Sequence, residues 1–193
     1  FAAGLALRSE RKKIKNIRQK FQYNFHNTVD DYLQYSPLLL TTGLKMAGIE
    51  GRSKWGRYAV SATASYAVMA LLVNSIKYSA REQRPDGSTC NSFPSGHTAP
   101  AFAAATILHK EYGLTRSPWY SIGGYLLATA TGCMRVLNNR HWVSDTFAGA
   151  GVGILSTELG YTLADLLFRQ KGLLRPDRID APLFSDQPSF FSV

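Results

Sequence analysis

A Pro-Ser-Gly-His tetrapeptide directly before a long alanine-rich run is the feature of this sequence that most constrains its fold. Pro94 and Gly96 are turn-forming residues, whereas residues 99–108 are apolar without period-two alternation, which predicts a buried helix. Ser95 and His97 therefore lie where a helix begins, with unpaired backbone N–H groups and the positive end of the helix dipole facing outward. Such a terminus binds anions, and His97 at its edge is a candidate proton donor.

The remaining apolar segments predict further helices and no convincing strand, so the expected class is all-α. Helical patterns cover, in order, residues 9–33, a segment that starts at Ser36, and residues 57–81, 98–112, 118–136 and 140–169. We interpret the 193 residues as a single-domain helical bundle. The expected parts are an N-terminal basic amphipathic helix (residues 1–35), a helical domain (residues 36–172) and a proline-containing tail (residues 173–193).

The formal net charge of +9 favours an anionic substrate or partner. Much of this charge lies around an apolar stripe in residues 9–33, formed by Ile14, Ile17, Phe21, Phe25 and Val29. The segment is either a core-facing helix with a solvated basic face or a helix that lies on anionic phospholipid. No nucleic acid is expected as a partner, because the aromatic residues lie on the apolar side and no recognition motif follows.

Membrane association is less clear from the sequence. Residues 58–76 are uncharged and long enough to span a bilayer, but they include several serine, threonine and asparagine residues. The last helical segment carries Glu158 and Asp165, which are costly in hydrocarbon. With a mean hydropathy of −0.13, we favour a globular domain whose apolar helices are buried and which is seated on a membrane. The opening residues 1–7 fit the end of an anchor or export segment.

Two further groups of charged residues flank the tetrapeptide. Upstream, Lys77 precedes Arg84 and Pro85 by two helical turns, so both cations are expected on one face near a helix end that Pro85 terminates. Taken alone, these two cations are more typical of a pair that complements the helix dipole. The adjacent Asp30 and Asp31 point to different sides of a helix, and we interpret them as surface or structural charges.

Downstream, Arg135 is followed by His141 and then, four residues later, by Asp145. Asn139 is expected to cap a helix that carries His141, so the helix dipole would keep the imidazole neutral. Asp145 would accept a hydrogen bond from one ring nitrogen and raise the pKa of the ring, so the two effects on the pKa oppose each other. Alone, His141 and Asp145 would be an ordinary surface pair.

Together the three groups supply three cations, an anion-binding helix start, a donor histidine and a histidine oriented by a carboxylate. Phosphoryl transfer requires neutralised equatorial oxygens, an in-line nucleophile and an acid on the leaving oxygen. These residues meet each requirement without a metal.

The blocks Lys77-x6-Arg84-Pro85, Pro94-Ser95-Gly96-His97 and Arg135-x5-His141-x3-Asp145 resemble the signature of the type 2 phosphatidic acid phosphatase superfamily. That superfamily also includes bacterial non-specific acid phosphatases and vanadium haloperoxidases. The third block departs from the usual Ser-Arg opening, since Met134 precedes the arginine. The resemblance implies a helical bundle with its site at one end, no metal or other cofactor, and vanadate binding as a phosphate mimic.

The resemblance also implies a role for each motif residue. His141 attacks phosphorus and becomes a phosphohistidine, Asp145 orients it, and His97 protonates the leaving alcohol before activating water. The phosphoryl oxygens are held by Lys77, Arg84, Arg135, the Ser95 hydroxyl and the Gly96 N–H.

The expected function is a phosphatase acting on phosphomonoesters, with lipid phosphates or diphosphates preferred and soluble esters left open. The alternatives are a vanadate-dependent haloperoxidase that uses the same pocket and a non-catalytic protein at a membrane surface. We expect contact with an anionic membrane surface and an active site in the bacterial periplasm or on the equivalent non-cytoplasmic side. A disulfide between Cys90 and Cys133 is possible but not required.

Overall fold

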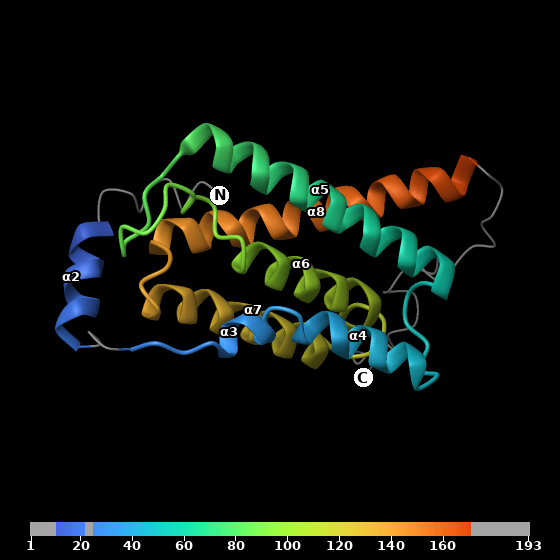
Figure 1. Cartoon of the computed structure of the whole chain (residues 1–193). Coiled ribbons are helices and arrows are strands. Elements are labelled where there is room, and N and C mark those ends of the chain that lie inside the picture. The colour runs from blue at the N-terminus through green and yellow to red at the C-terminus, as the bar shows by residue number, and fades with distance from the viewer. Residues whose placement is uncertain (1–10, 22–24, 171–193) are drawn as a thin grey trace, which may run out of the picture.

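The computed structural model describes residues 11–21 and 25–170, and the part it describes is helical without strands, as the sequence predicts. The helices are α2 (Arg11–Phe21), α3 (Val29–Leu33), α4 (Ser36–Met46), α5 (Trp55–Ala80), α6 (Thr98–Leu108), α7 (Pro118–Leu137) and α8 (Val143–Gln170). A π-helical turn, η1 (His109–Gly113), continues α6. The helices α4 to α8 run side by side along one long axis (Figure 1). Residues 1–7 and the tail at 173–193 lie outside the described residues.

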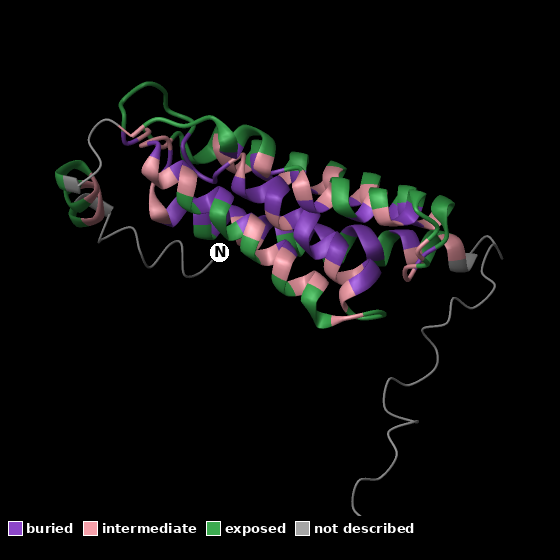
Figure 2. Ribbon diagram, turned by 90° about the horizontal axis from the view of Figure 1, so that it is seen from below, coloured by how far each residue is buried: buried purple, intermediate pink, exposed green. Residues whose placement is uncertain are grey.

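The alanine-rich α6 forms the centre of the bundle. Nearly all of its residues are buried, and it packs against α4, α5, α7 and α8. Figure 2 shows this buried strip running through the middle of the molecule. The small side chains of α6 let its neighbours approach closely, and this brings the start of α6 into contact with the start of α8.

Glycines on α8 make the close helix contacts possible. A Cβ atom on Gly153 would collide with the carbonyl oxygen of Ala99 and lie 2.9 Å from the backbone nitrogen of Ala103, both on α6. A Cβ atom on Gly160 would collide with the backbone of Ser65 on α5. The sequence of α8 therefore fixes how near α5 and α6 lie to it.

The end of the bundle that carries η1 is held by a buried ion pair. Glu111 is fully buried, and its carboxylate lies 2.9 Å from Lys45 Nζ and accepts a hydrogen bond from the Tyr161 hydroxyl at 3.0 Å. The Ser53 backbone N–H donates to the same carboxylate at 3.1 Å. These contacts join α4, η1 and α8 at the end of the bundle opposite the three sequence motifs.

The prediction of one continuous helix over residues 9–33 is wrong. Residues 25–28 are not helical, and α3 begins only at Val29. The helix is interrupted because the Asn27 backbone bonds to the side chain of Asn138 at the end of α7. The Asn27 N–H donates to Asn138 Oδ1 at 2.9 Å, and Asn138 Nδ2 donates to the Asn27 carbonyl at 2.7 Å. The Asn27 side chain then accepts from the Val29 N–H at 2.8 Å, where α3 starts.

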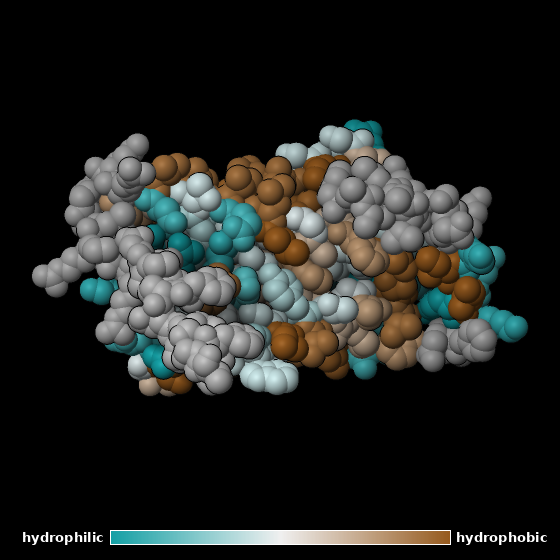
Figure 3. Space-filling model, turned by 180° about the vertical axis from the view of Figure 1, so that it is seen from behind, coloured by the Kyte–Doolittle hydropathy of each residue, from teal (hydrophilic) through white to brown (hydrophobic). Residues whose placement is uncertain are grey.

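The expectation that the apolar helices are buried holds for α6 but not for its neighbours. Leu71 on α5 is 70% exposed and Leu126 on α7 is 65% exposed. Other large apolar side chains are exposed on α4 (Leu39, Met46), α7 (Trp119, Ile122) and α8 (Leu155, Leu159, Leu163, Leu166, Leu167). Figure 3 shows apolar side chains over much of one face. Among the described residues, α5 alone is long and apolar enough to cross a membrane.

Candidate active site

The predicted site residues meet at one end of the bundle, where α5 and α7 end and α6 and α8 begin (Figure 1). The irregular segment between α5 and α6 crosses this end and contributes Asn91 and Ser92. Four helix ends and one loop thus supply side chains that are far apart in the sequence.

His141 is buried and held by a backbone carbonyl. Its Nδ1 lies 2.8 Å from the carbonyl oxygen of Ser92 and 3.7 Å from Asp145 Oδ2. A carbonyl oxygen only accepts hydrogen bonds, so Nδ1 carries the proton and Nε2 keeps its lone pair. Asp145 is therefore not the hydrogen-bond acceptor that we expected for the ring; Ser92 is.

Burial decides the charge of His141. Burial lowers the pKa of the imidazole, Lys77 and Arg135 act in the same direction and Asp145 acts against them, and the resulting pKa is about 4 instead of 6.5. The ring is therefore neutral near neutral pH, which answers the question that the opposing sequence effects left open. The expected helix cap at Asn139 is wrong: α8 begins at Val143, and Asn139 has a φ of 58° in the loop before it.

Asp145 is fully buried and connects three segments around His141. Its carboxylate accepts hydrogen bonds from the hydroxyl of Ser92, the N–H of Trp142 at 2.9 Å and the hydroxyl of Ser144 at 3.2 Å. Its backbone carbonyl accepts from the Ser95 N–H at 3.0 Å. Asp145 thus fixes the loop that presents the Ser92 carbonyl to His141, and it acts on the ring through that loop and its charge.

Lys77 and Arg84 come together through a loop and not through a shared helix face. The helix α5 ends at Ala80, before Pro85, and Arg81 adopts the left-handed conformation there. Lys77 Nζ donates to the Asn91 carbonyl, and Arg84 Nε donates to Asn91 Oδ1 at 3.0 Å. Lys77 also passes beside Gly96, where an added Cβ would lie 3.7 Å from Lys77 Cε.

Arg135 is buried and keeps a free donor. Its Nη1 donates to Asp30 Oδ2 at 2.7 Å and lies 3.5 Å from Asp31 Oδ1, whereas its buried Nε has no hydrogen-bond partner. A buried guanidinium N–H without a partner is costly unless a ligand satisfies it. Arg135 lowers the pKa of His97, His141 and Arg84 alike, so it lies close to all three.

The tetrapeptide lies at the start of α6, as the sequence predicts. His97 is the N-cap residue, and the Ser95 hydroxyl accepts from Thr98 N–H at 3.3 Å and from Thr98 Oγ1 at 2.9 Å. The Ser95 hydroxyl proton remains available to a bound anion. Burial, followed by the charge of Arg135, lowers the pKa of His97 from 6.5, while Asp31 and Asp30 raise it.

Sequence reasoning missed four residues at this end. Asn91 and Ser92 lack any motif signal other than their position just before the tetrapeptide. Asp30 and Asp31 were interpreted as surface or structural charges, but Asp30 is fully buried against Arg135 and Asp31 contacts His97. The only sequence signal for Asp30 and Asp31 is that two adjacent acids precede a strongly basic set of motif residues, and this signal is weak.

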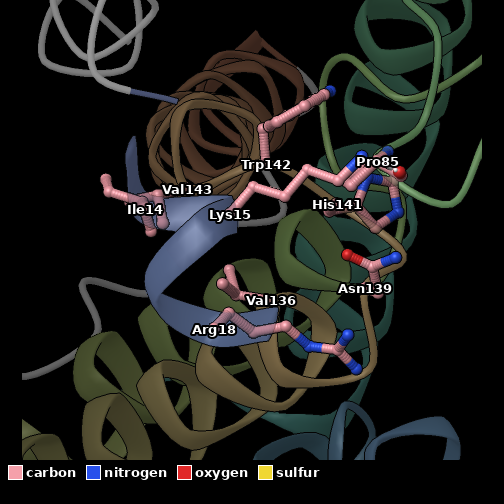
Figure 4. A pocket seen from close by; sticks show the side chains of 9 residues that line it. All are labelled: Ile14, Lys15, Arg18, Pro85, Val136, Asn139, His141, Trp142 and Val143. Carbon is pink, nitrogen blue, oxygen red and sulfur yellow. Dashed lines mark hydrogen bonds between the residues drawn. The ribbon is translucent and has the colours of Figure 1, made fainter. Parts of the chain in front are cut away.

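A small pocket that is open to solvent lies beside His141, between α2 and the loop before α8. In Figure 4, Lys15 extends from α2 toward Pro85, and its Nζ donates to the Pro85 carbonyl at 2.7 Å. Arg18 donates from Nε and Nη2 to the Leu137 carbonyl at 3.0 and 2.8 Å. Lys15 and Arg18 of α2 thus contact the active-site end, and both line the pocket together with His141.

The two cysteines, His109 and the Trp142 indole make other contacts. Cys90 and Cys133 are both free and exposed, so the possible disulfide is not formed. His109 is on η1 at the opposite end of the bundle, with Nδ1 2.8 Å from the Ser121 hydroxyl. Trp142 donates from Nε1 to the Gln83 carbonyl at 2.9 Å, consistent with a packing role.

The fold and these contacts agree with one class of protein. A family model described as the PAP2 superfamily matches residues 57–169, which is more than half of the chain and includes every predicted site residue. The chain therefore belongs to the PAP2 superfamily, as the three sequence blocks predict.

Among individual proteins, the lipid A 1-phosphatase of Porphyromonas gingivalis is 48% identical over 169 residues. The aligned part is 87% of this chain and 38% of that protein, so the chain spans well under half the length of this relative.

Two crystal structures share the fold. Aquifex aeolicus LpxE is 21% identical with a TM-score of 0.56, over 76% of this chain and 93% of that one. A transmembrane PAP2 type phosphatidylglycerolphosphate phosphatase from Bacillus subtilis is 19% identical with a TM-score of 0.57, over 85% of this chain and 91% of that one. These likenesses confirm the predicted bundle.

Proposed function

We propose that the chain is a phosphatase domain that hydrolyses phosphate monoesters of lipids through a phosphohistidine on His141. The observation that carries the proposal is the buried, uncharged ring of His141 beside Arg135, whose Nε donor lacks a partner. A neutral imidazole is a nucleophile, and an unsatisfied guanidinium N–H fits a phosphoryl oxygen. The phosphatase name of the Porphyromonas relative supports the same reaction class.

In the first step, the lone pair on His141 Nε2 attacks phosphorus and the ester P–O bond breaks. The leaving oxygen takes a proton from His97. Charge on the equatorial oxygens is neutralised by Lys77, Arg84 and Arg135. Ser92, which accepts from Nδ1, fixes the tautomer that this attack needs.

In the second step, the now neutral His97 takes a proton from water while the water oxygen attacks phosphorus. The P–N bond breaks, inorganic phosphate leaves, and His141 returns to its starting form. Asp145 keeps the Ser92 loop in place throughout. We expect no metal to take part.

The proposed substrate class is a lipid phosphate, and lipid A 1-phosphate is the first substrate to test. The 48% identity to a lipid A 1-phosphatase supports this choice. The exposed apolar side chains on α4, α5, α7 and α8 also suit a protein that meets its substrate in a bilayer. We propose further that α5 spans the membrane and that the site lies on its non-cytoplasmic side.

The central test measures phosphate release by this chain in detergent micelles. We expect turnover of p-nitrophenyl phosphate without added metal, and its abolition in His141→Ala, because this variant lacks the proposed nucleophile. His26→Ala removes an exposed histidine and serves as the matched control, with activity retained. Activity that persists in His141→Ala contradicts the proposed nucleophile.

The same preparation tests the substrate class. Turnover of lipid A 1-phosphate in mixed micelles should exceed that of glycerol phosphate, and equal or lower turnover of the lipid would remove the reason for preferring it. Vanadate should inhibit as a phosphate mimic. Bromide oxidation with peroxide and vanadate, without phosphatase activity, would instead support the haloperoxidase alternative.

A further inference from the structure

Two adjacent carboxylates on the short helix α3 contact the active-site groups from outside the three motifs. Asp30 is fully buried and accepts from Arg135 Nη1 at 2.7 Å and from Asn138 Nδ2 at 3.0 Å. Asp31 is half exposed, and its Oδ1 lies 2.8 Å from His97 Nε2. One turn of helix therefore holds both the phosphate-binding arginine and the donor histidine.

The position of α3 is fixed by contacts to the end of α7. Asn27 exchanges two hydrogen bonds with the Asn138 side chain, at 2.9 and 2.7 Å, and Asn138 also donates to Asp30. A buried carboxylate is costly without partners, and the hydrogen bonds from Arg135 and Asn138 offset this cost for Asp30. With Asp30 anchored in this way, the neighbouring Asp31 is directed toward His97.

We propose that Asp31 is a positioning residue for His97: its carboxylate holds the proton on Nε2 and turns Nδ1 toward the oxygen of the leaving group. A carboxylate only accepts hydrogen bonds, so the contact fixes which ring nitrogen is protonated. When the ring is doubly protonated, the proton on Nδ1 goes to the leaving oxygen as the P–O bond breaks. The remaining Nε2–H tautomer then has its lone pair on Nδ1, where it can take a proton from water. This inference rests on the proposed phosphatase function.

The charges around His97 make Asp31 important for its protonation. Burial and Arg135 on α7 lower the pKa of His97, and Asp31 and Asp30 on α3 act in the opposite direction. Asp31 is the one of these two acids that bonds the ring directly. Its removal leaves the lowering effects with less opposition, so His97 would hold its proton over a narrower pH range.

The first test compares Asp31→Asn with the unmodified chain on two substrates, p-nitrophenyl phosphate and phenyl phosphate. Nitrophenolate leaves without help from an acid, whereas phenolate needs a proton. We expect kcat/KM to fall about tenfold to hundredfold for phenyl phosphate and no more than about threefold for p-nitrophenyl phosphate. The parameter kcat/KM reports the step in which the leaving group departs, so slow hydrolysis of the phosphoenzyme does not mask the difference.

The second test measures the pH profile, which a purely structural role would not move. Activity is lost at high pH as the donor histidine loses its proton, so a lower pKa in Asp31→Asn moves this limb to lower pH. Asp31→Glu, which keeps a carboxylate, should restore part of the activity and move the limb back. In a His97→Asn background the Asp31→Asn change should add no further loss, because Asp31 acts only through His97.

Glu158→Gln is the matched control. Glu158 is 51% exposed against 49% for Asp31, and it pairs with Lys110 on η1 at the other end of the bundle. Both substrates and the pH limb should be unchanged in this variant. Equal losses on the two phosphates in Asp31→Asn, an unmoved limb, or an additive loss in the His97→Asn background would each overturn the inference. Absence of phosphate release by the unmodified chain would instead overturn the proposed function.

Discussion

His141 and His97 carry the same side chain in different surroundings at the active-site end of the bundle. His141 is enclosed, and burial lowers its pKa to about 4. His97 is part-buried, with the Asp31 carboxylate on one ring nitrogen and Arg135 nearby, and its pKa is lowered from 6.5. The two environments suit opposite roles, since a nucleophile must be neutral and a proton donor must be charged.

These shifts predict a bell-shaped dependence of kcat/KM on pH. Activity should rise as His141 loses its proton near pH 4 and fall as His97 loses its proton below its ordinary value of 6.5, which gives an acidic optimum. The measurement uses phenyl phosphate, whose leaving group needs the proton of His97, from about pH 3 to about pH 9. The phosphate group of the substrate also titrates near pH 6, so a second substrate with a different phosphate pKa separates enzyme limbs from substrate limbs. An optimum above neutrality would contradict the assignment.

At the scale of the helices, glycine on α8 decides how closely α6 approaches. Gly153 faces the backbone of α6 at Ala99 and Ala103, where no side chain has room. Ala99 is one turn from Ser95, so a shift of α6 at this crossing also moves the tetrapeptide. The spacing of two helices and the geometry of the anion site are thus set by the same contact.

The variant Gly153→Ala should lower the free energy of unfolding by about 1–3 kcal/mol or more, because the added methyl group meets backbone atoms that cannot rotate away. Thermal unfolding in detergent measures this, and kcat/KM should fall with the displaced start of α6. Gly123→Ala on α7 is the matched control: nothing lies within 4 Å of its added Cβ. There the substitution should be neutral or stabilising by up to about 1 kcal/mol. Equal behaviour of the two variants would contradict the packing argument.

For the whole molecule, the outward apolar side chains and the polar active-site end fit the bilayer orientation that we propose. The exposed leucines lie along α5, α7 and α8, whereas the loops between α5 and α6 and between α7 and α8 carry charged groups. The site would then face the aqueous side at the membrane surface, where the phosphate of a lipid lies.

The two free cysteines offer a direct test of this orientation. Cys90 lies in the loop at the active-site end and Cys133 on α7, and both are exposed. In a Cys133→Ser variant expressed in bacterial cells, a thiol reagent that does not cross the inner membrane should label Cys90 from the periplasmic side. Cys90→Ser,Cys133→Ser is the control for background labelling. Labelling of Cys90 only after the inner membrane is permeabilised would place the site on the cytoplasmic side.

The sequence alone determined the helical class and the start of α6 at the tetrapeptide, and it predicted a set of groups that phosphoryl transfer would need. These follow from local rules, since turn residues, apolar periodicity and motif spacing act within a few residues of each other. The predicted ends of α5 and α8 are also correct to within a few residues. The predicted shared helix face for Lys77 and Arg84 is wrong, because Asn91 in the loop joins them. The predicted helix cap before His141 is wrong as well.

Only the tertiary structure decided which partners the site residues have. The Ser92 carbonyl on His141, the anchoring of Arg135 by Asp30 and the contact of Asp31 with His97 join residues 49, 105 and 66 positions apart. The protonation state of His141 was likewise undecided in the sequence, because the dipole and the carboxylate oppose each other there. Burial resolved it, and burial is a property of the packed bundle that no single segment carries.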